Sequence, residues 1–99
     1  MRRGTTPTHE FTTDIDLSTA DKIYITYKQG GVVKLEKALP DITVTPTKLI
    51  VTLTQEETLS FSINKGVEIQ IRALLIGGEA IASNVITTTA QKILKEGVI

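Results

Sequence analysis

Apolar residues recur at every second position through most of this 99-residue chain. Side chains of a β-strand alternate between its two faces, so this period predicts strands with one buried and one solvent-exposed face. The composition agrees, because 16 threonines, 13 isoleucines and 7 valines carry the Cβ branching that fits a pleated surface better than a helix. The pattern therefore predicts an all-β protein.

The alternation divides into seven runs separated by turn-forming residues. The clearest run is 67–75, where apolar and polar residues alternate without interruption. The other predicted strands cover residues 11–17, 23–28, 33–35, 42–44, 49–53 and 79–89. Pro40 and Pro46 flank the run at 42–44, and proline cannot donate a backbone hydrogen bond. This strand is therefore predicted to be short and to lie at a sheet edge.

The connections between the runs are too short for the helices that join parallel strands, so antiparallel pairing is expected. A helical turn is predicted at residues 55–58, where Thr54 and Glu57 have the spacing of a capping box. Seven short strands in a chain of this length are typical of an immunoglobulin-like sandwich, with a small barrel as the competing architecture. We predict a single domain over residues 1–99: a seven-stranded antiparallel immunoglobulin-like β-sandwich with at most one or two short helical turns.

Two Gly-Gly pairs mark hairpin turns, and the registers follow from parity, because residues paired across two strands share a face. In the first hairpin, a three-residue turn at 29–31 places Ile25 and Tyr27 on the same face as Val33 and Leu35. A two-residue turn would bring the charged Glu36 opposite an inward-facing residue. The three-residue turn is therefore preferred.

The second hairpin allows two registers. A two-residue turn at 77–78, which we prefer because Gly-Gly suits the primed hairpin turns, pairs Ala73 with Ala82 and Ile69 with Ile86. A turn with an odd number of residues is the alternative. With either register, large apolar side chains of this hairpin point away from the core. The preferred register predicts an exposed apolar interaction face made of Leu74, Ile76, Ile81 and Val85.

Charge and composition exclude several functions. Eleven basic and eleven acidic residues give no net charge, so the chain lacks the positive field that nonspecific nucleic-acid binding requires. Cysteine is absent, which excludes disulfides, thiol catalysis and thiolate metal sites. No apolar run approaches the roughly 20 residues of a membrane helix, and the first residues lack the apolar stretch of a secretory signal. We therefore expect neither a nucleic-acid nor a membrane partner.

The chain contains no arrangement of residues that is typical of catalysis, cofactor binding or metal binding. His9 is the only histidine and has no ligand or general-base partner at suitable spacing, so we interpret it as an exposed residue without a role. Asp14 and Asp16 are interpreted as part of a solvated strand face. Tyr24 is the one aromatic residue that alternation turns outward, and a carbohydrate site would have to form around it. We predict that the protein is not an enzyme.

Association is the function that the pattern favours. Both ends of the chain carry strand-favouring residues, so residues 1–8 and 95–99 are predicted to be extended arms that add to a neighbouring subunit as edge strands. The exposed apolar face of the last hairpin also favours a surface that a partner covers. Together these features indicate a structural or assembly role.

Five strings of this sequence resemble short proteins encoded by phages and prophages of Gram-positive gut bacteria. They are MRRGTTPT (1–8), IVTLTQEET (50–58), VEIQIR (67–72), AIASN (80–84) and ILKEGVI (93–99). More distantly, the chain is similar to the immunoglobulin-like N-terminal domain of upper baseplate proteins of Gram-positive siphophages, which attaches receptor-binding parts to the tail.

This resemblance implies a virion structural or accessory protein that is associated with the tail or baseplate and has no enzymatic residues or cofactor. Its expected partners are proteins, namely other phage tail proteins or a second copy of the chain. Its expected location is the virion, or the cytoplasm of the bacterial host before assembly. A stand-alone carbohydrate- or surface-binding β-sandwich module is the alternative.

Overall fold

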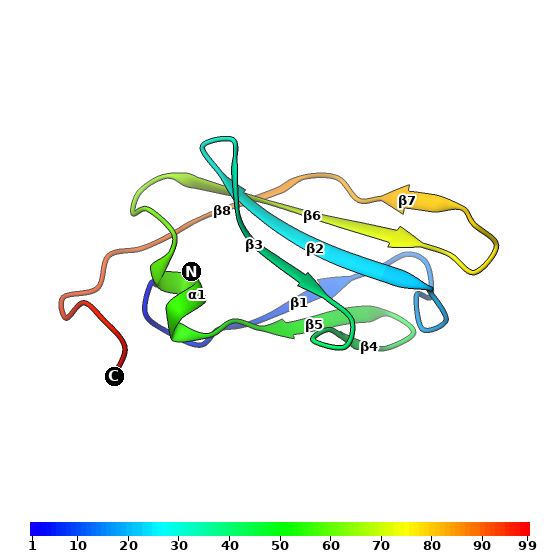
Figure 1. The fold of residues 1–99 in the computed structure, drawn as a ribbon, viewed down its shortest axis with the longest axis horizontal. Coiled ribbons are helices and arrows are strands. Elements are labelled where there is room, and N and C mark those ends of the chain that lie inside the picture. The colour runs from blue at the N-terminus through cyan, green and yellow to red at the C-terminus, as the bar shows by residue number, and fades with distance from the viewer.

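A computed structural model describes residues 1–99 as two antiparallel β-sheets packed face to face (Figure 1). The elements in chain order are β1 Thr8–Thr12, β2 Lys22–Gln29, β3 Val32–Ala38, β4 Thr43–Val44, β5 Lys48–Thr52, α1 Gln55–Leu59, β6 Gly66–Leu74, β7 Ala80–Ala82 and β8 Ile86–Thr89. One sheet has the strand order β1-β5-β4, and the other has the order β3-β2-β6-β7, with β8 also paired to β6. The prediction of an all-β antiparallel sandwich is confirmed.

The strand order identifies the sandwich as immunoglobulin-like. In that fold, strands A, B, E and D form one sheet, and strands C, F and G form the other, which gains a C′ strand in variable-type domains. Here β1, β5 and β4 take the places of B, E and D, while β3, β2 and β6 take those of C′, C and F. β7 and β8 together occupy the place of G, so the seventh predicted strand is split into two. No strand of residues 1–99 takes the place of A beside β1.

The core fills the space between the two sheets and follows the predicted alternation. Ile23, Ile25 and Tyr27 of β2 point inward and pair with the inward-facing residues of β6. Each fully buried aliphatic side chain contributes about 1.5–3 kcal/mol relative to an exposed one. The buried apolar residues are Phe11, Leu17, Ile23, Ile25, Tyr27, Ile42, Leu49, Val51, Leu53, Phe61, Val67, Ile69, Ile71, Ala73 and Ala90.

Local sequence signals fix α1 and β4 as predicted. The Thr54 hydroxyl accepts a hydrogen bond from the Glu57 N–H at 3.1 Å, and the Glu57 carboxylate accepts one from the Thr54 N–H at 2.8 Å. This reciprocal capping box satisfies two N–H groups that a helix start otherwise leaves unpaired. β4 has only two residues and is an edge strand, as the flanking prolines predicted.

The first strand is shorter than predicted. The alternation predicted a strand over 11–17, but β1 ends at Thr12. Beyond it the Asp16 carboxylate accepts a hydrogen bond from the Ser18 N–H at 2.9 Å, which is the local bond of an Asx-turn and competes with strand pairing. Leu17 nevertheless reaches the core from this loop, whereas Ile15 stays half-exposed.

The first hairpin has a different turn from the predicted one. Gly30 and Gly31 form a two-residue turn, and both have positive φ, 60° and 77°. Positive φ at both central residues is what a type I′ hairpin turn requires. One extra residue on β3 then makes a bulge, after which Tyr27 pairs with Leu35. The predicted inward face of Leu35 is therefore correct, but Val33 lies opposite Lys28 and faces outward.

The preferred register of the last hairpin is wrong near its turn. Residues 76–78 form a three-residue turn, closed by a hydrogen bond from the Leu75 N–H to the Glu79 carbonyl at 2.8 Å. Ala73 consequently pairs with Ile81, so the Ile81 side chain faces the sandwich interior instead of solvent. Gly78, with φ of 89°, supplies the positive φ that an odd turn requires.

The register of the last hairpin changes again before β8. The Ser83 hydroxyl accepts a hydrogen bond from the Ile71 N–H at 3.0 Å. In a regular ladder, a backbone carbonyl of the neighbouring strand would accept this bond. After this irregularity Ile69 pairs with Ile86, as predicted. The two halves of the hairpin therefore differ by one residue in register.

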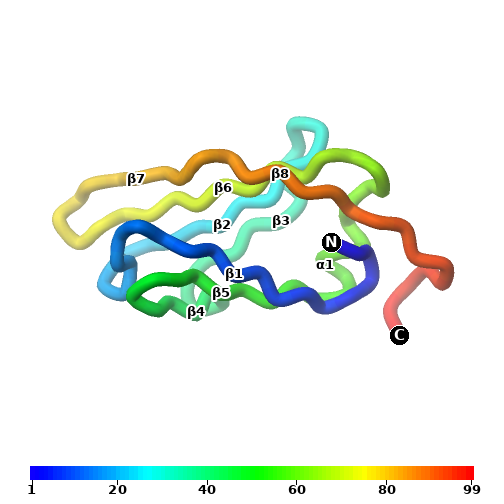
Figure 2. The backbone as a smooth tube through the Cα atoms, turned by 180° about the vertical axis from the view of Figure 1, so that it is seen from behind, coloured from blue at the N-terminus to red at the C-terminus, as the bar shows by residue number.

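Both predicted arms are tied back to the same molecule. The first residues run parallel to the segment after β8, with hydrogen bonds from the Arg3 N–H to the Gln91 carbonyl at 3.1 Å and from the Gln91 N–H to the Met1 carbonyl at 2.8 Å (Figure 2). At the other end, the Ile99 N–H donates to the Gln55 side chain at 2.8 Å. Segments 1–8 and 95–99 therefore do not extend away from the domain.

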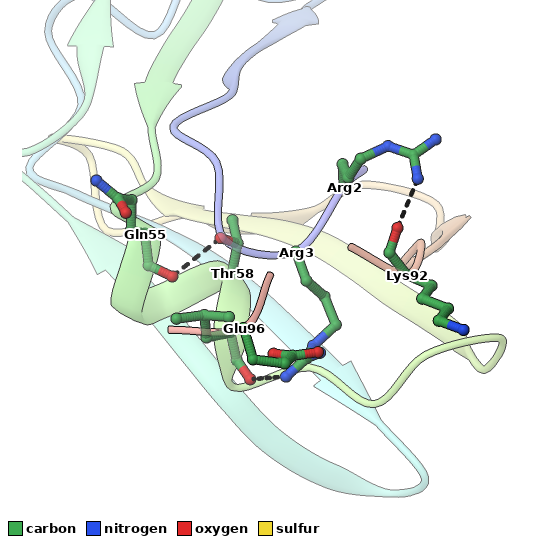
Figure 3. Close-up of polar contacts among 7 residues, drawn as sticks. Arg2, Arg3, Gln55, Thr58, Lys92 and Glu96 are labelled. Atoms are coloured by element: carbon green, nitrogen blue, oxygen red, sulfur yellow. Dashed lines mark hydrogen bonds and ion pairs between the residues drawn. The ribbon is translucent and has the colours of Figure 1, made fainter. Parts of the chain in front are cut away.

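Side chains reinforce this arrangement (Figure 3). Arg3 forms an ion pair of 2.7 Å with Glu96, and Arg2 donates to the Lys92 carbonyl at 2.6 Å. The buried Thr58 hydroxyl lies 3.0 Å from the carbonyl oxygens of both Thr5 and Gln55, either of which can accept its one hydrogen. The side chains of Arg2 and Arg3 are therefore used within the fold.

Gln29 provides a test of how the loop before β6 is held. Its buried side chain accepts from the Ser62 N–H at 2.7 Å and donates to the carbonyls of Ser62 and Lys65. Gln29→Leu leaves these buried groups unpaired and should lower the free energy of unfolding by about 2 kcal/mol. Urea unfolding measures the change. Lys28→Ala, on the outer face of the same strand, should change stability by less than about 0.5 kcal/mol.

Candidate interaction site

The structure does not bring the four predicted interaction residues onto one face. Leu74 is half-buried on β6, and Ile76 lies in the β6–β7 turn with 75% of its surface exposed. Val85 is 51% exposed in the segment between β7 and β8. Ile81 is turned inward by the three-residue turn and packs against the core. A single exposed apolar face made of these residues is therefore absent.

Ile81 instead helps to form a groove at one side of the sandwich. The groove has a volume of about 430 Å³ and lies between the end of β1 with its following loop and strands β6, β7 and β8. It extends from half-exposed residues at the surface, Ile15 and Ile86, to the core residues Ile71 and Ala73. Its apolar lining residues are Ile15, Leu17, Ile71, Ala73, Ile81, Ala82 and Ile86.

The polar lining residues of the groove are Thr12, Thr13, Asp14, Ser83 and Asn84. Asp14 is its one charged residue. The Thr13 hydroxyl is buried and has no hydrogen-bond partner in the molecule, which is costly for a polar atom removed from water. The Ser83 hydroxyl is already bonded within the fold. The groove can therefore receive apolar side chains.

The only histidine lies in a different place from the predicted one. We interpreted His9 as exposed, but it is half-buried, and its Nδ1 lies 2.7 Å from the hydroxyl of Tyr27 on the facing sheet. The two rings are stacked with centroids 5.8 Å apart. A signal for this position was present in the sequence, because His9 lies two residues before the buried Phe11, and alternate residues of a strand share a face.

Burial changes the titration of this pair. Desolvation, followed by the charge of the terminal amino group, lowers the pKa of His9. Desolvation, followed by the charge of Glu57, raises the pKa of Tyr27. Both groups are therefore neutral at pH 7, and the contact is a neutral hydrogen bond between the two sheets.

The remaining candidates for chemistry are dispersed. No three residues of the types His, Cys, Asp and Glu lie close enough to hold a metal ion. The Asp16 carboxylate accepts hydrogen bonds from the hydroxyl and the N–H of Ser18, and these bonds lower the pKa of Asp16. Tyr24 lies on the outer face of β2, and its ring contacts no other aromatic ring. No helix has the length and apolar character needed to cross a membrane.

Comparison with protein-family models finds no match, and comparison with curated proteins finds none either. Among solved structures, the V domain of amphioxus IgVJ-C2 is similar, with a TM-score of 0.37 and 15% sequence identity. The similarity covers 92% of this chain and 97% of that one. The strand order described above identifies the immunoglobulin-like fold independently of this similarity.

The His9–Tyr27 contact predicts a pH dependence of stability. Because the pKa of His9 is lower in the folded protein than its value of about 6.5 in the unfolded chain, protonation favours unfolding. The free energy of unfolding should be constant above about pH 7 and should decrease as the pH falls below about 6.5. Urea unfolding at a series of pH values measures this decrease.

His9→Asn is the matched control. Asparagine keeps a polar atom near the Tyr27 hydroxyl but does not titrate, so the decrease between about pH 7 and pH 5.5 should disappear. The same decrease in both proteins would show that another group causes it.

Proposed function

We propose that this domain is a non-catalytic protein-interaction module that serves as a structural or accessory protein of a phage or prophage, associated with the tail or baseplate. The apolar groove between β1 and β6–β8 is the observation that supports an interaction role. The phage assignment rests on the resemblance of the sequence to short phage and prophage proteins. The proposed location is the virion, or the host cytoplasm before assembly.

The chemistry of the groove favours a protein partner over a glycan. Binding of a sugar requires several convergent hydrogen-bonding groups and stacked aromatic rings. The groove has no aromatic lining residue, and seven of its twelve lining residues are apolar. Aliphatic side chains of another protein match its walls, and burying each of them fully would contribute about 1.5–3 kcal/mol.

Ile86→Lys tests this proposal. Ile86 is 43% exposed at the rim of the groove, so the substitution should leave the fold intact while it places a charge in an apolar contact. We expect binding to tail proteins encoded by neighbouring genes to weaken at least about tenfold, equivalent to about 1.4 kcal/mol. Light scattering and titration calorimetry of the purified proteins measure the complex and its affinity.

Leu94→Lys is the control, because Leu94 is 96% exposed and lies outside the groove. It should bind like the unmodified chain. Failure of the unmodified chain to bind any tail protein would contradict the proposed role. Binding to a glycan array that is lost in Tyr24→Ala would support the carbohydrate-binding alternative instead.

A further inference from the structure

We propose that the groove and the free edge of β1 together receive an extended strand of another protein, which joins the β1-β5-β4 sheet as a fourth strand beside β1. This inference rests on the proposed interaction function and specifies how the partner binds. Strand addition of this kind derives affinity from main-chain hydrogen bonds and specificity from alternate side chains.

Hydrogen-bond alternation shows which groups of β1 are available. In an antiparallel pair, every second residue bonds the neighbouring strand, and the residues between them point away from it. The Leu53 N–H bonds the Pro7 carbonyl, and the Thr13 N–H bonds the Thr47 carbonyl, so odd-numbered residues of β1 bond β5. The N–H and C=O groups of Thr8, Glu10 and Thr12 therefore point to the free edge, and β1 has no second neighbour in its sheet.

The other sheet edges are protected against strand addition. β4 and β7 are edge strands of only two and three residues, and Pro40 and Pro46 flank β4. β3 contains a bulge at Lys34, and bulges and lysines are devices that block pairing at an edge. β8 is partly covered by residues 1–3, which bond the carbonyl of Thr89 and both backbone groups of Gln91. β1 is the five-residue edge that carries none of these devices.

The groove continues from the free edge of β1. Thr12 and Thr13 line its beginning, and Ile15, Ile81 and Ile86 line its sides. A strand that runs beside β1 and past its end would therefore place its inward-facing side chains in the groove.

Charge favours a different protein over a second copy of this chain. A symmetric pairing that uses all five residues of two β1 edges would place Glu10 opposite Glu10 of the other copy, and like charges directly opposite each other destabilise a sheet. Glu10 forms an exposed ion pair with Lys48 at 3.5 Å, and an exposed pair of this kind offsets only part of the repulsion. With Asp14 as the one charged residue of the groove, the surface fits a strand with alternate apolar residues and basic flanking residues.

Synthetic ten-residue peptides provide the test. They alternate valine or isoleucine with threonine, in three registers, and end in lysine, threonine or glutamate. On binding of the lysine-ended peptides, hydrogen exchange at the amides of Thr8, Glu10 and Thr12 should slow at least about tenfold, and the NMR signals of Ile81 and Ile86 should shift. No binding by any peptide at about 1 mM, or protection confined to β3, would overturn the proposal. Protection of the same amides at high protein concentration without peptide would assign the edge to a second copy and would also overturn it.

Glu10→Pro separates edge pairing from general contact. It removes an N–H that does not bond β5, and proline is tolerated where the N–H of an edge strand faces solvent. Peptide affinity should fall at least about tenfold, whereas Glu10→Ala, which keeps the N–H, should lose less. Urea unfolding checks that both variants are folded. Unchanged peptide binding by folded Glu10→Pro would overturn strand addition. If Glu10→Pro does not fold, Ile86→Lys decides, because it should weaken peptide binding through the groove.

The two proposals fail in different ways. If Ile86→Lys loses its tail-protein partner while Glu10→Pro keeps it, the interaction role is supported and strand addition is wrong. If the peptides protect the β1 edge but no tail protein binds, strand addition is supported and the phage role is contradicted.

Discussion

The pairing of β2 with β6 is the interaction on which the rest of the structure depends. Eight consecutive residue pairs join these strands, from Lys22 with Leu74 to Gln29 with Val67, and their inward side chains form the centre of the core. β3, β7 and β8 are added to this pair, and the smaller sheet packs across it. Because the side-chain period of a strand is two, a slip of one residue here would turn the core residues of the slipped strand to the solvent face. The bulge of β3 and the register change of the last hairpin both lie outside this regular central pair.

Contacts between the two sheets complete the sandwich. Apolar packing supplies most of the stabilisation, but it has no direction and does not set how the sheets are positioned laterally. The hydrogen bond between His9 and Tyr27 is directional and joins one strand of each sheet. The ion pair of 2.8 Å between Lys37 and Glu57 has a similar effect between β3 and α1. These polar contacts help to select one packing among several that the same apolar residues would permit.

Local patterns in the sequence predicted the parts of the fold that local physics determines. The strands of the two main hairpins, the capping box at Thr54 and the short proline-flanked edge strand all follow from neighbouring residues. Parity arguments failed where two turn geometries give the same side-chain orientation or have nearly the same free energy. In the first hairpin, a two-residue turn followed by a bulge replaced the predicted three-residue turn. In the second hairpin, the turn has three residues instead of two. The groove could not be predicted, because it joins Ile15 to Ile81 and Ile86, which are distant along the chain, and because the inward orientation of Ile81 depends on that third residue.

The parallel contact between the first residues and the segment after β8 has a consequence for how the domain can be mounted. It holds both chain ends near α1, whereas the β6–β7 turn lies at the opposite end of a molecule 47 Å long (Figure 1). A label, a surface tether or a fused protein joined to either end would therefore emerge at the α1 pole. The far pole, with the loop after β1, would then point outward and remain accessible.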